Sequence, residues 1–167
     1  MKKISLLFIG ILFLSCSQNQ NYLQDEGIVD IDYLKNSPKT YWFEENFQNY
    51  SVERINKENF SKLYNYDIEI FMNTFCHDSQ REIPRLIKIL EKLNFPEQKL
   101  KIVLLSPNKK SKMGYEVNKN ITNTPTIIFN LDNTEINRIV ELPKESLEND
   151  ILKIINDEDY KHAYFIE

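Results

Sequence analysis

A chain of 167 residues has room for one domain with a proper core and is too short for two comfortable ones. Its 41% hydrophobic and 28% charged residues are ordinary for a globular domain. The formal net charge of −4 and the lack of a basic stripe argue against nucleic acid as a partner.

The N-terminus carries two lysines and then an apolar run over residues 4–14 that is interrupted only by Ser5. This run is too short to cross a bilayer, which takes about 20 apolar residues, and its basic start is typical of a secretory signal. Its end, Phe13-Leu14-Ser15-Cys16, resembles the lipobox of bacterial lipoproteins, although Phe13 stands where a smaller aliphatic residue is more common. That resemblance implies acylation of Cys16, and an ordinary cleaved signal is the alternative.

We therefore expect a signal peptide at 1–15 and a lipidated polar tether at 16–39. The acyl chains would hold the protein at a bacterial membrane, facing the periplasm. If lipidation consumes Cys16, then Cys76 has no second cysteine in the chain with which to pair.

Residues 40–65 are rich in aromatic and charged side chains at roughly helical intervals, which predicts an N-terminal extension of one or two short helices. Residues 68–72 form a short apolar run typical of a buried strand. One face of an amphipathic helix follows, formed by Ile83, Leu86, Ile87, Leu90 and Leu93.

Four more elements complete the predicted domain at 66–156. Residues 100–106 and 124–130 have the composition of buried strands, and residues 134–142 alternate as a fourth strand after a short turn. A helix is predicted over 144–156, and the tail at 157–167 has no clear pattern. The strand–helix–strand order indicates parallel pairing and the turn an antiparallel addition, so we expect a mixed four-stranded α/β sheet with helices on both faces.

This element order and three local features resemble the thioredoxin family. The family's Trp-Cys-x-x-Cys loop aligns with Phe75-Cys76-His77-Asp78-Ser79, and Pro84 follows inside the next helix. Thr124-Pro125 lies at the entrance to the third strand, where the family has a cis-proline. More narrowly, the chain is similar to exported thioredoxin-like proteins with a Cys-x-Asp-Ser loop. The resemblance implies a thioredoxin-like fold with a mixed four-stranded central sheet flanked by helices.

The family's dithiol reaction cannot be carried over, because Ser79 replaces the second cysteine. The reactive species at Cys76 would be the thiolate, which a protonated His77 and a helix N-terminus favour and Asp78 disfavours. The Ser79 hydroxyl can donate a hydrogen bond to the sulfur but forms no disulfide. A mixed disulfide would then need an external thiol for its release, which limits Cys76 to monothiol exchange.

The resemblance also implies a client site. A cis peptide before Pro125 would expose the backbone of Thr124 to an extended client beside Cys76 and Phe75, whereas a trans proline at a strand edge is the alternative. The expected partners are protein or small-thiol disulfides and an external thiol reductant, with no cofactor. Two histidines and one available thiol make a structural zinc site improbable, so no metal is expected.

Two questions stay open at this point. Ser79 and Glu82 fit a capping box, so the helix can begin at Ser79 and leave Cys76 outside it, although the resemblance favours a start at Cys76. The protein is expected to be a monothiol oxidoreductase or isomerase, and the alternative is a redox-inactive module that binds peptides beside Pro125. Cys76 would also be unable to carry out thiol exchange if it were buried in the core or formed a disulfide with another chain.

Overall fold

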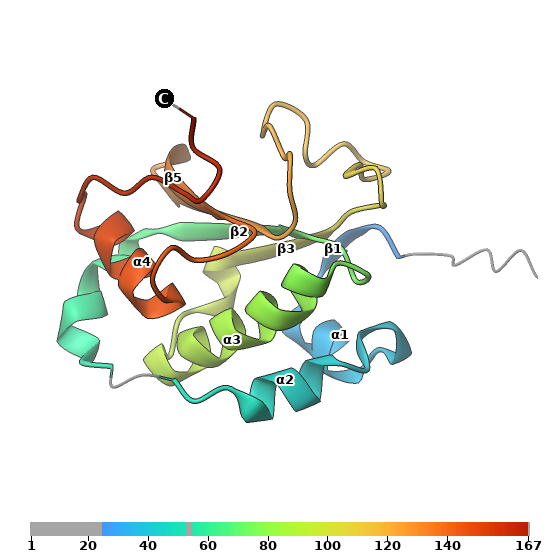
Figure 1. The fold of residues 1–167 in the computed structure, drawn as a ribbon, viewed down its shortest axis with the longest axis horizontal. Coiled ribbons are helices and arrows are strands. Elements are labelled where there is room, and N and C mark those ends of the chain that lie inside the picture. Colours follow the sequence, from blue (N-terminus) through green and yellow to red (C-terminus); the bar gives the residue numbers. More distant parts are fainter. Residues whose placement is uncertain (1–24, 53–54, 167) are drawn as a thin grey trace, which may run out of the picture.

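The computed structural model describes residues 25–52 and 55–166 (Figure 1). The predicted signal peptide and the predicted lipidation site Cys16 lie outside these residues. The strands are β1 (Gly27–Val29), β2 (Asp67–Met72), β3 (Leu100–Leu104), β4 (Thr126–Leu131) and β5 (Thr134–Val140). The α-helices are α1 (Ile31–Asn36), α2 (Phe43–Asn49), α3 (His77–Leu93) and α4 (Leu147–Ile155), and the 3-10 helices are η1 (Pro38–Thr40), η2 (Lys57–Asn65) and η3 (Glu97–Lys99). No helix of the described residues is long and apolar enough to cross a bilayer.

The strands form one mixed sheet in the order β1-β3-β2-β4-β5. β2 and β3 are parallel, with Ile70 opposite Ile102, because α3 carries the chain back to the starting edge between them. β4 pairs antiparallel with β2, and a short turn then places β5 antiparallel to β4. The mixed α/β class and the four predicted strands are therefore confirmed, but the sheet has five strands rather than four.

The fifth strand comes from the segment predicted to be a tether. β1 pairs antiparallel with the open edge of β3, with Ile28 opposite Val103. Directly after it, the Asp30 side chain accepts a hydrogen bond from the Tyr33 backbone at 2.7 Å and caps α1. The expectation of an irregular tether up to residue 39 therefore does not hold from Gly27 onward. A strand of three residues is too short to show an alternating pattern in the sequence. β1 forms because its backbone pairs with the open edge of β3.

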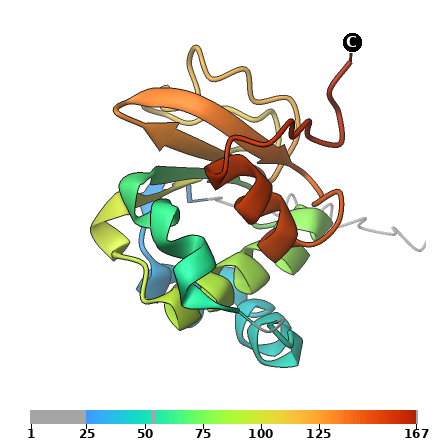
Figure 2. The ribbon, with the colours of Figure 1, turned by 90° about the vertical axis from the view of Figure 1, so that its left-hand side faces the viewer.

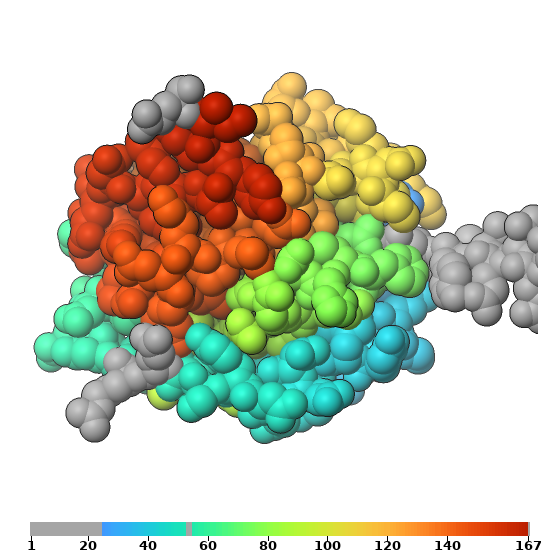
Figure 3. Space-filling model, in the orientation of Figure 1, coloured from blue at the N-terminus to red at the C-terminus, as the bar shows by residue number. Residues whose placement is uncertain are grey.

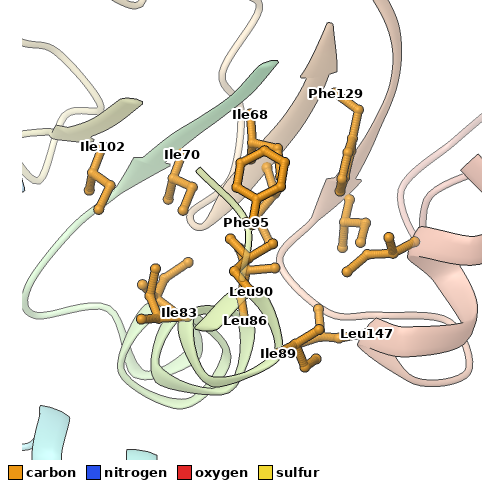
Figure 4. Close-up of a cluster of buried hydrophobic side chains, with 14 of the residues drawn as sticks. Ile68, Ile70, Ile83, Leu86, Ile89, Leu90, Phe95, Ile102, Phe129 and Leu147 are labelled. Atoms are coloured by element: carbon orange, nitrogen blue, oxygen red, sulfur yellow. The ribbon is translucent and has the colours of Figure 1, made fainter. Parts of the chain in front are cut away.

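All four α-helices lie on one side of the sheet (Figure 2). Figure 4 shows strand side chains such as Ile68, Ile70 and Phe129 pointing toward Leu86 and Leu90 of α3. The predicted helical face is confirmed, since every residue in it is at most 3% exposed. The helices of the 40–65 extension, α2 and η2, are confirmed as well, with their aromatic residues packed on this core.

The expectation of helices on both faces is wrong. The second face of the sheet carries a smaller apolar cluster that includes Phe71 and Ile128, and Tyr115 and Ile121 cover it from the connection between β3 and β4. That connection, residues 105–125, has no regular element and passes through left-handed residues such as Lys109. Its polar sequence has no helical periodicity, so it crosses the sheet as a series of turns.

The C-terminal tail packs against the domain although its sequence has no clear pattern. Tyr160 is 4% exposed, its hydroxyl donates to Asp150 at 2.8 Å, and its carbonyl accepts from Asn137 of β5 at 3.0 Å. The core that these elements enclose runs from Ile31 to Tyr160.

Candidate functional site

A turn centred on Asn73 shapes the chain between β2 and α3. The Asn73 side-chain oxygen accepts from the Phe75 backbone at 2.8 Å, and the Asn73 carbonyl accepts from the Cys76 backbone at 3.1 Å. Its amide group donates to the Leu105 carbonyl at 3.1 Å. Asn73 therefore ties the cysteine loop to the segment that follows β3. The sequence analysis missed it, although asparagine after a strand is a known turn former.

Cys76 is the N-cap of α3, with extended backbone angles of −75° and 122°. Its carbonyl accepts from the Gln80 backbone at 2.9 Å, which begins the helix, while its side chain makes no capping hydrogen bond. The helix start favoured by the resemblance is confirmed, and the capping box at Ser79 is wrong because Ser79 lies inside α3. Cys76 is thus the residue from which a side chain can reach the free N–H groups of the first turn of α3, although its thiol bonds elsewhere in this arrangement.

The thiol meets a segment 48 residues away in sequence. Cys76 Sγ donates to the Thr124 carbonyl at 2.9 Å, and the peptide bond from Thr124 to Pro125 is cis, as the resemblance implies. The side chain is half-buried and not part of either core cluster. This hydrogen bond requires the thiol proton, so ionisation exchanges it for interaction with the N–H groups at the start of α3.

The hydroxyl of Ser79 is directed to the backbone of the turn at Asn73. Ser79 is fully buried, and its hydroxyl accepts from the Asn73 backbone at 3.4 Å. No hydrogen bond joins it to Cys76 among the residues that the structure describes. The Ser79 hydroxyl supports the turn at Asn73, and the expected donation to the thiolate is not present in this arrangement.

The charges of the loop are arranged by Arg81. Asp78 and Arg81 form an ion pair at 2.8 Å, and Arg81 also contacts Glu82 at 2.6 Å. The Asp78 carboxylate thus has a cation beside it, which offsets the repulsion that it would exert on a thiolate. His77 is exposed on the first turn, and its side chain makes no hydrogen bond to Cys76 within the described residues. Arg81 was not predicted, and only its i,i+3 spacing from Asp78 could have indicated it.

The thiol lies between one exposed residue and one buried segment. Phe75 directly precedes it and is 53% exposed, whereas Thr124 and Pro125 are buried. Behind Pro125, the Glu141 backbone donates to the Pro125 carbonyl at 2.7 Å, and its carboxylate accepts from the Tyr164 hydroxyl. The structure therefore brings together the predicted residues Phe75, Cys76 and Thr124-Pro125. Glu141 and the tail residue Tyr164 carry no sequence signal and were missed.

The described residues gather no group of three or more His, Cys, Asp or Glu side chains that could hold a metal ion. Glu82 is 2% exposed and accepts from Arg81 and Arg85, so its carboxylate is held by cations from its own helix. What the arrangement can do chemically therefore depends on the sulfur of Cys76.

Comparison with known proteins identifies no family. No family model and no curated protein matches the chain. One solved structure that resembles it is a crystal structure of a protein of unknown function from Pseudomonas aeruginosa, at 12% identity and a TM-score of 0.46. The match covers 73% of this chain and 82% of that one. A similarity at this level carries no inference about function.

Proposed function

We propose that this chain is a thioredoxin-like thiol–disulfide exchange protein that acts through the single thiol of Cys76. The observation that carries the proposal is the position of Cys76 Sγ, half-buried at the N-cap of a 17-residue helix and 2.9 Å from the Thr124 carbonyl. Two segments distant in sequence meet there with the residue types of a thiol active site, namely a cysteine at a helix start and a proline-bearing strand entrance.

The helix provides the electrostatic support that thiol exchange needs. Free N–H groups at a helix N-terminus carry partial positive charge and stabilise an anion by about 0.3–1 kcal/mol at an exposed site and more when partly buried. The thiolate of Cys76 would gain this interaction and lose its hydrogen bond to the Thr124 carbonyl. The ion pair with Arg81 offsets part of the negative charge that Asp78 brings to the same turn.

The proposed reaction is exchange without net oxidation. The Cys76 thiolate attacks one sulfur of a client disulfide, a new S–S bond forms, and the second client sulfur leaves with the electron pair as a thiolate. An external thiol, or another thiol of the client, then attacks the mixed disulfide and restores Cys76. The buried hydroxyl of Ser79 cannot take this second step. Isomerisation of protein disulfides and removal of small-thiol adducts both fit this sequence of steps.

One observation favours a second candidate, a redox-inactive peptide-binding module. The hydrogen bond to the Thr124 carbonyl engages the protonated thiol and so opposes ionisation. A serine hydroxyl at position 76 can donate to the same carbonyl and leave the surrounding surface intact. The variant Cys76→Ser therefore separates the two functions, since it removes exchange but not peptide binding.

The test uses the chain 17–167, in which Cys76 is the only cysteine and the complete described fold is present. The chain is incubated with oxidised glutathione and with scrambled ribonuclease in a thiol buffer. We expect a glutathione adduct on Cys76 by mass spectrometry and recovery of ribonuclease activity, both absent from Cys76→Ser. An adduct-free native chain, or equal ribonuclease recovery with the serine variant, would contradict the proposal.

We further propose that acylated Cys16 anchors the protein to a bacterial membrane facing the periplasm. The support is the lipobox-like sequence that ends the apolar run. The full chain is expressed in bacteria that are fed a labelled fatty acid. We expect label on the protein and its recovery in the membrane fraction, with both lost in Cys16→Ala. Label that persists in this variant would contradict the anchoring.

A further inference from the structure

The segment 106–120, which we name the lysine loop, is a basic part of an acidic chain. It holds four lysines and one glutamate in 15 residues, whereas the chain as a whole has a net charge of −4. Lys119 pairs with Glu69, but the other three, Lys109, Lys110 and Lys112, form no ion pair within 4.0 Å in the part of the chain that the structure describes. These three lysines therefore have no direct ion-pair partner among the described residues.

The same loop exposes two apolar side chains beside these lysines. Met113 is 73% exposed and Val117 is 58% exposed. The Val117 side chain packs close to Gly114, the residue after Met113. A Cβ added to Gly114 would lie 3.2 Å from a methyl carbon of Val117. The lysine loop thus exposes two apolar side chains four residues apart, on the same short segment as Lys109, Lys110 and Lys112.

The lysine loop has an internal framework that fixes this display. The buried Glu116 carboxylate accepts from the Ser111 backbone at 3.0 Å and from the Ser111 hydroxyl at 2.6 Å. The Ser111 hydroxyl in turn accepts from the Tyr115 backbone at 2.9 Å, and Tyr115 packs on the apolar cluster of the sheet. In this framework Tyr115 packs on the sheet, whereas Met113 is exposed to solvent.

The lysine loop lies where the chain enters the fold. Gly27 of β1 pairs with Leu104, the last residue before the connection that contains the loop. Hydrogen bonds from Lys39 and Tyr33 lower the pKa of Asp25, and the nearby charge of Lys112 lowers it further. Figure 3 shows the loop in yellow as a lobe at one end of the surface, next to the blue start of the fold.

Covalent geometry then limits the distance between this face and an anchor at Cys16. Only residues 17–24 separate Cys16 from Asp25, and a fully extended chain of that length spans about 30 Å. An acyl group on Cys16 would therefore hold the end of the domain that bears the lysine loop close to the bilayer surface. Anionic headgroups attract lysines that come this close, and exposed apolar side chains add to binding by entering the headgroup region.

We propose that the lysine loop is a membrane-docking surface that binds the anionic headgroups of the bilayer, with Met113 and Val117 entering the headgroup layer. The inference rests on the proposed anchoring at Cys16 for its location, and its chemistry is tested without the lipid. Asn73 ties the cysteine loop to Leu105, so docking places Cys76 at the membrane-facing end of the sheet. Clients held close to the membrane surface would then be reached most readily.

The test is flotation of the chain 17–167 with vesicles of phosphatidylcholine mixed with phosphatidylglycerol, and with vesicles of phosphatidylcholine alone. We expect binding to the anionic vesicles only, weakened when salt is raised from about 50 to about 200 mM. The variant Lys109→Gln/Lys110→Gln/Lys112→Gln should lose about tenfold or more of this binding. The variant Met113→Ser should show a smaller loss on the same vesicles.

A matched control removes the same charge elsewhere. Lys57, Lys62 and Lys92 are exposed, lie outside the loop and belong to no ion pair within the described residues. Changing all three to glutamine should leave vesicle binding within about twofold of the wild type. Equal losses in both triple variants, equal binding to neutral vesicles, or no binding at low salt would overturn the docking surface. The glutathione adduct on Cys76 is measured in the same samples, so failure of docking is distinguished from failure of thiol exchange.

Discussion

The substitution Tyr160→Phe tests how the C-terminal tail is held to the domain. Asp150 is fully buried and accepts three hydrogen bonds, from the Tyr160 hydroxyl at 2.8 Å and from the backbones of Lys144 and Glu145 at 2.7 and 3.2 Å. The phenylalanine variant keeps the ring and removes only one donor. The network joins the tail, α4 and the loop that leads from β5 to α4.

The expected cost follows from the chemistry of that donor. A hydrogen bond to a charged group contributes about 1.5–3 kcal/mol, and the carboxylate of Asp150 keeps its two backbone donors in the variant. We therefore expect Tyr160→Phe to lower the free energy of unfolding by about 2 kcal/mol, which corresponds to a fall in Tm of roughly 4–8 °C for a chain of this size. Urea unfolding and thermal unfolding at neutral pH measure both values.

The pH dependence provides a second readout. Burial, and then the hydrogen bond to Asp150, raise the pKa of Tyr160 above its ordinary value of 10.0. A raised pKa means that the unfolded chain releases this proton first, so the stability from Tyr160 is complete below pH 10.0 and declines as pH rises above it. The difference between the wild type and Tyr160→Phe should therefore narrow in alkaline solution.

Tyr33 offers a matched control, because its hydroxyl donates to the exposed Asp25 at 2.6 Å. The same chemistry in water-accessible surroundings contributes less, so Tyr33→Phe should cost no more than about 0.5–1 kcal/mol. Equal losses in the two variants, or a loss below about 0.5 kcal/mol for Tyr160→Phe, would refute the reasoning from burial.

Three further predictions follow from the sheet and the cysteine loop. Ser79→Cys should gain the ability to reduce insulin with dithiothreitol, because it places a second sulfur on the same helix as Cys76; an unchanged rate would count against the proposed site. Burial raises the pKa of Glu69, but hydrogen bonds from two lysines outweigh it and lower the pKa below 4.5. Stability from Glu69 is therefore present above pH 4.5 and lost as pH falls below it, and Glu69→Gln should flatten this part of the acid unfolding curve measured in urea. Asn73→Ala removes two side-chain hydrogen bonds to backbone groups, so it should cost about 2–3 kcal/mol in denaturant unfolding, and a cost under about 0.5 kcal/mol would show that the turn does not depend on this side chain.

The sequence predicted the elements whose periodicity is long enough to read. The apolar face of α3 is correct because its buried side chains recur at helical spacing, and β2, β3 and β4 are correct because each contains a short, mostly apolar run. β5 was predicted from its alternation after a short turn, and it forms the edge strand of the sheet. The meeting of Cys76 with Thr124 across 48 residues followed from the family resemblance alone, because no local pattern indicates which segments a sheet brings together.

The parts that were wrong depend on tertiary context. β1 has only three residues, and it is a strand because it pairs with the free edge of β3. Its own sequence has no strand pattern, so it was predicted to be part of the tether. The second face of the sheet is covered by turns anchored through Tyr115 and Ile121, whereas helices were expected on both faces. Ser79 fits a capping box in sequence, yet the turn at Asn73 starts the helix three residues earlier.

The most direct test of the account is the reaction rate of Cys76 with a small aromatic disulfide at neutral pH. The chain 17–167 is compared in its folded state and in urea, where the same sulfur lacks the helix N-terminus. The account predicts faster mixed-disulfide formation in the folded chain, because α3 stabilises the attacking thiolate. A folded chain that reacts more slowly than the unfolded one would contradict the proposed role of Cys76.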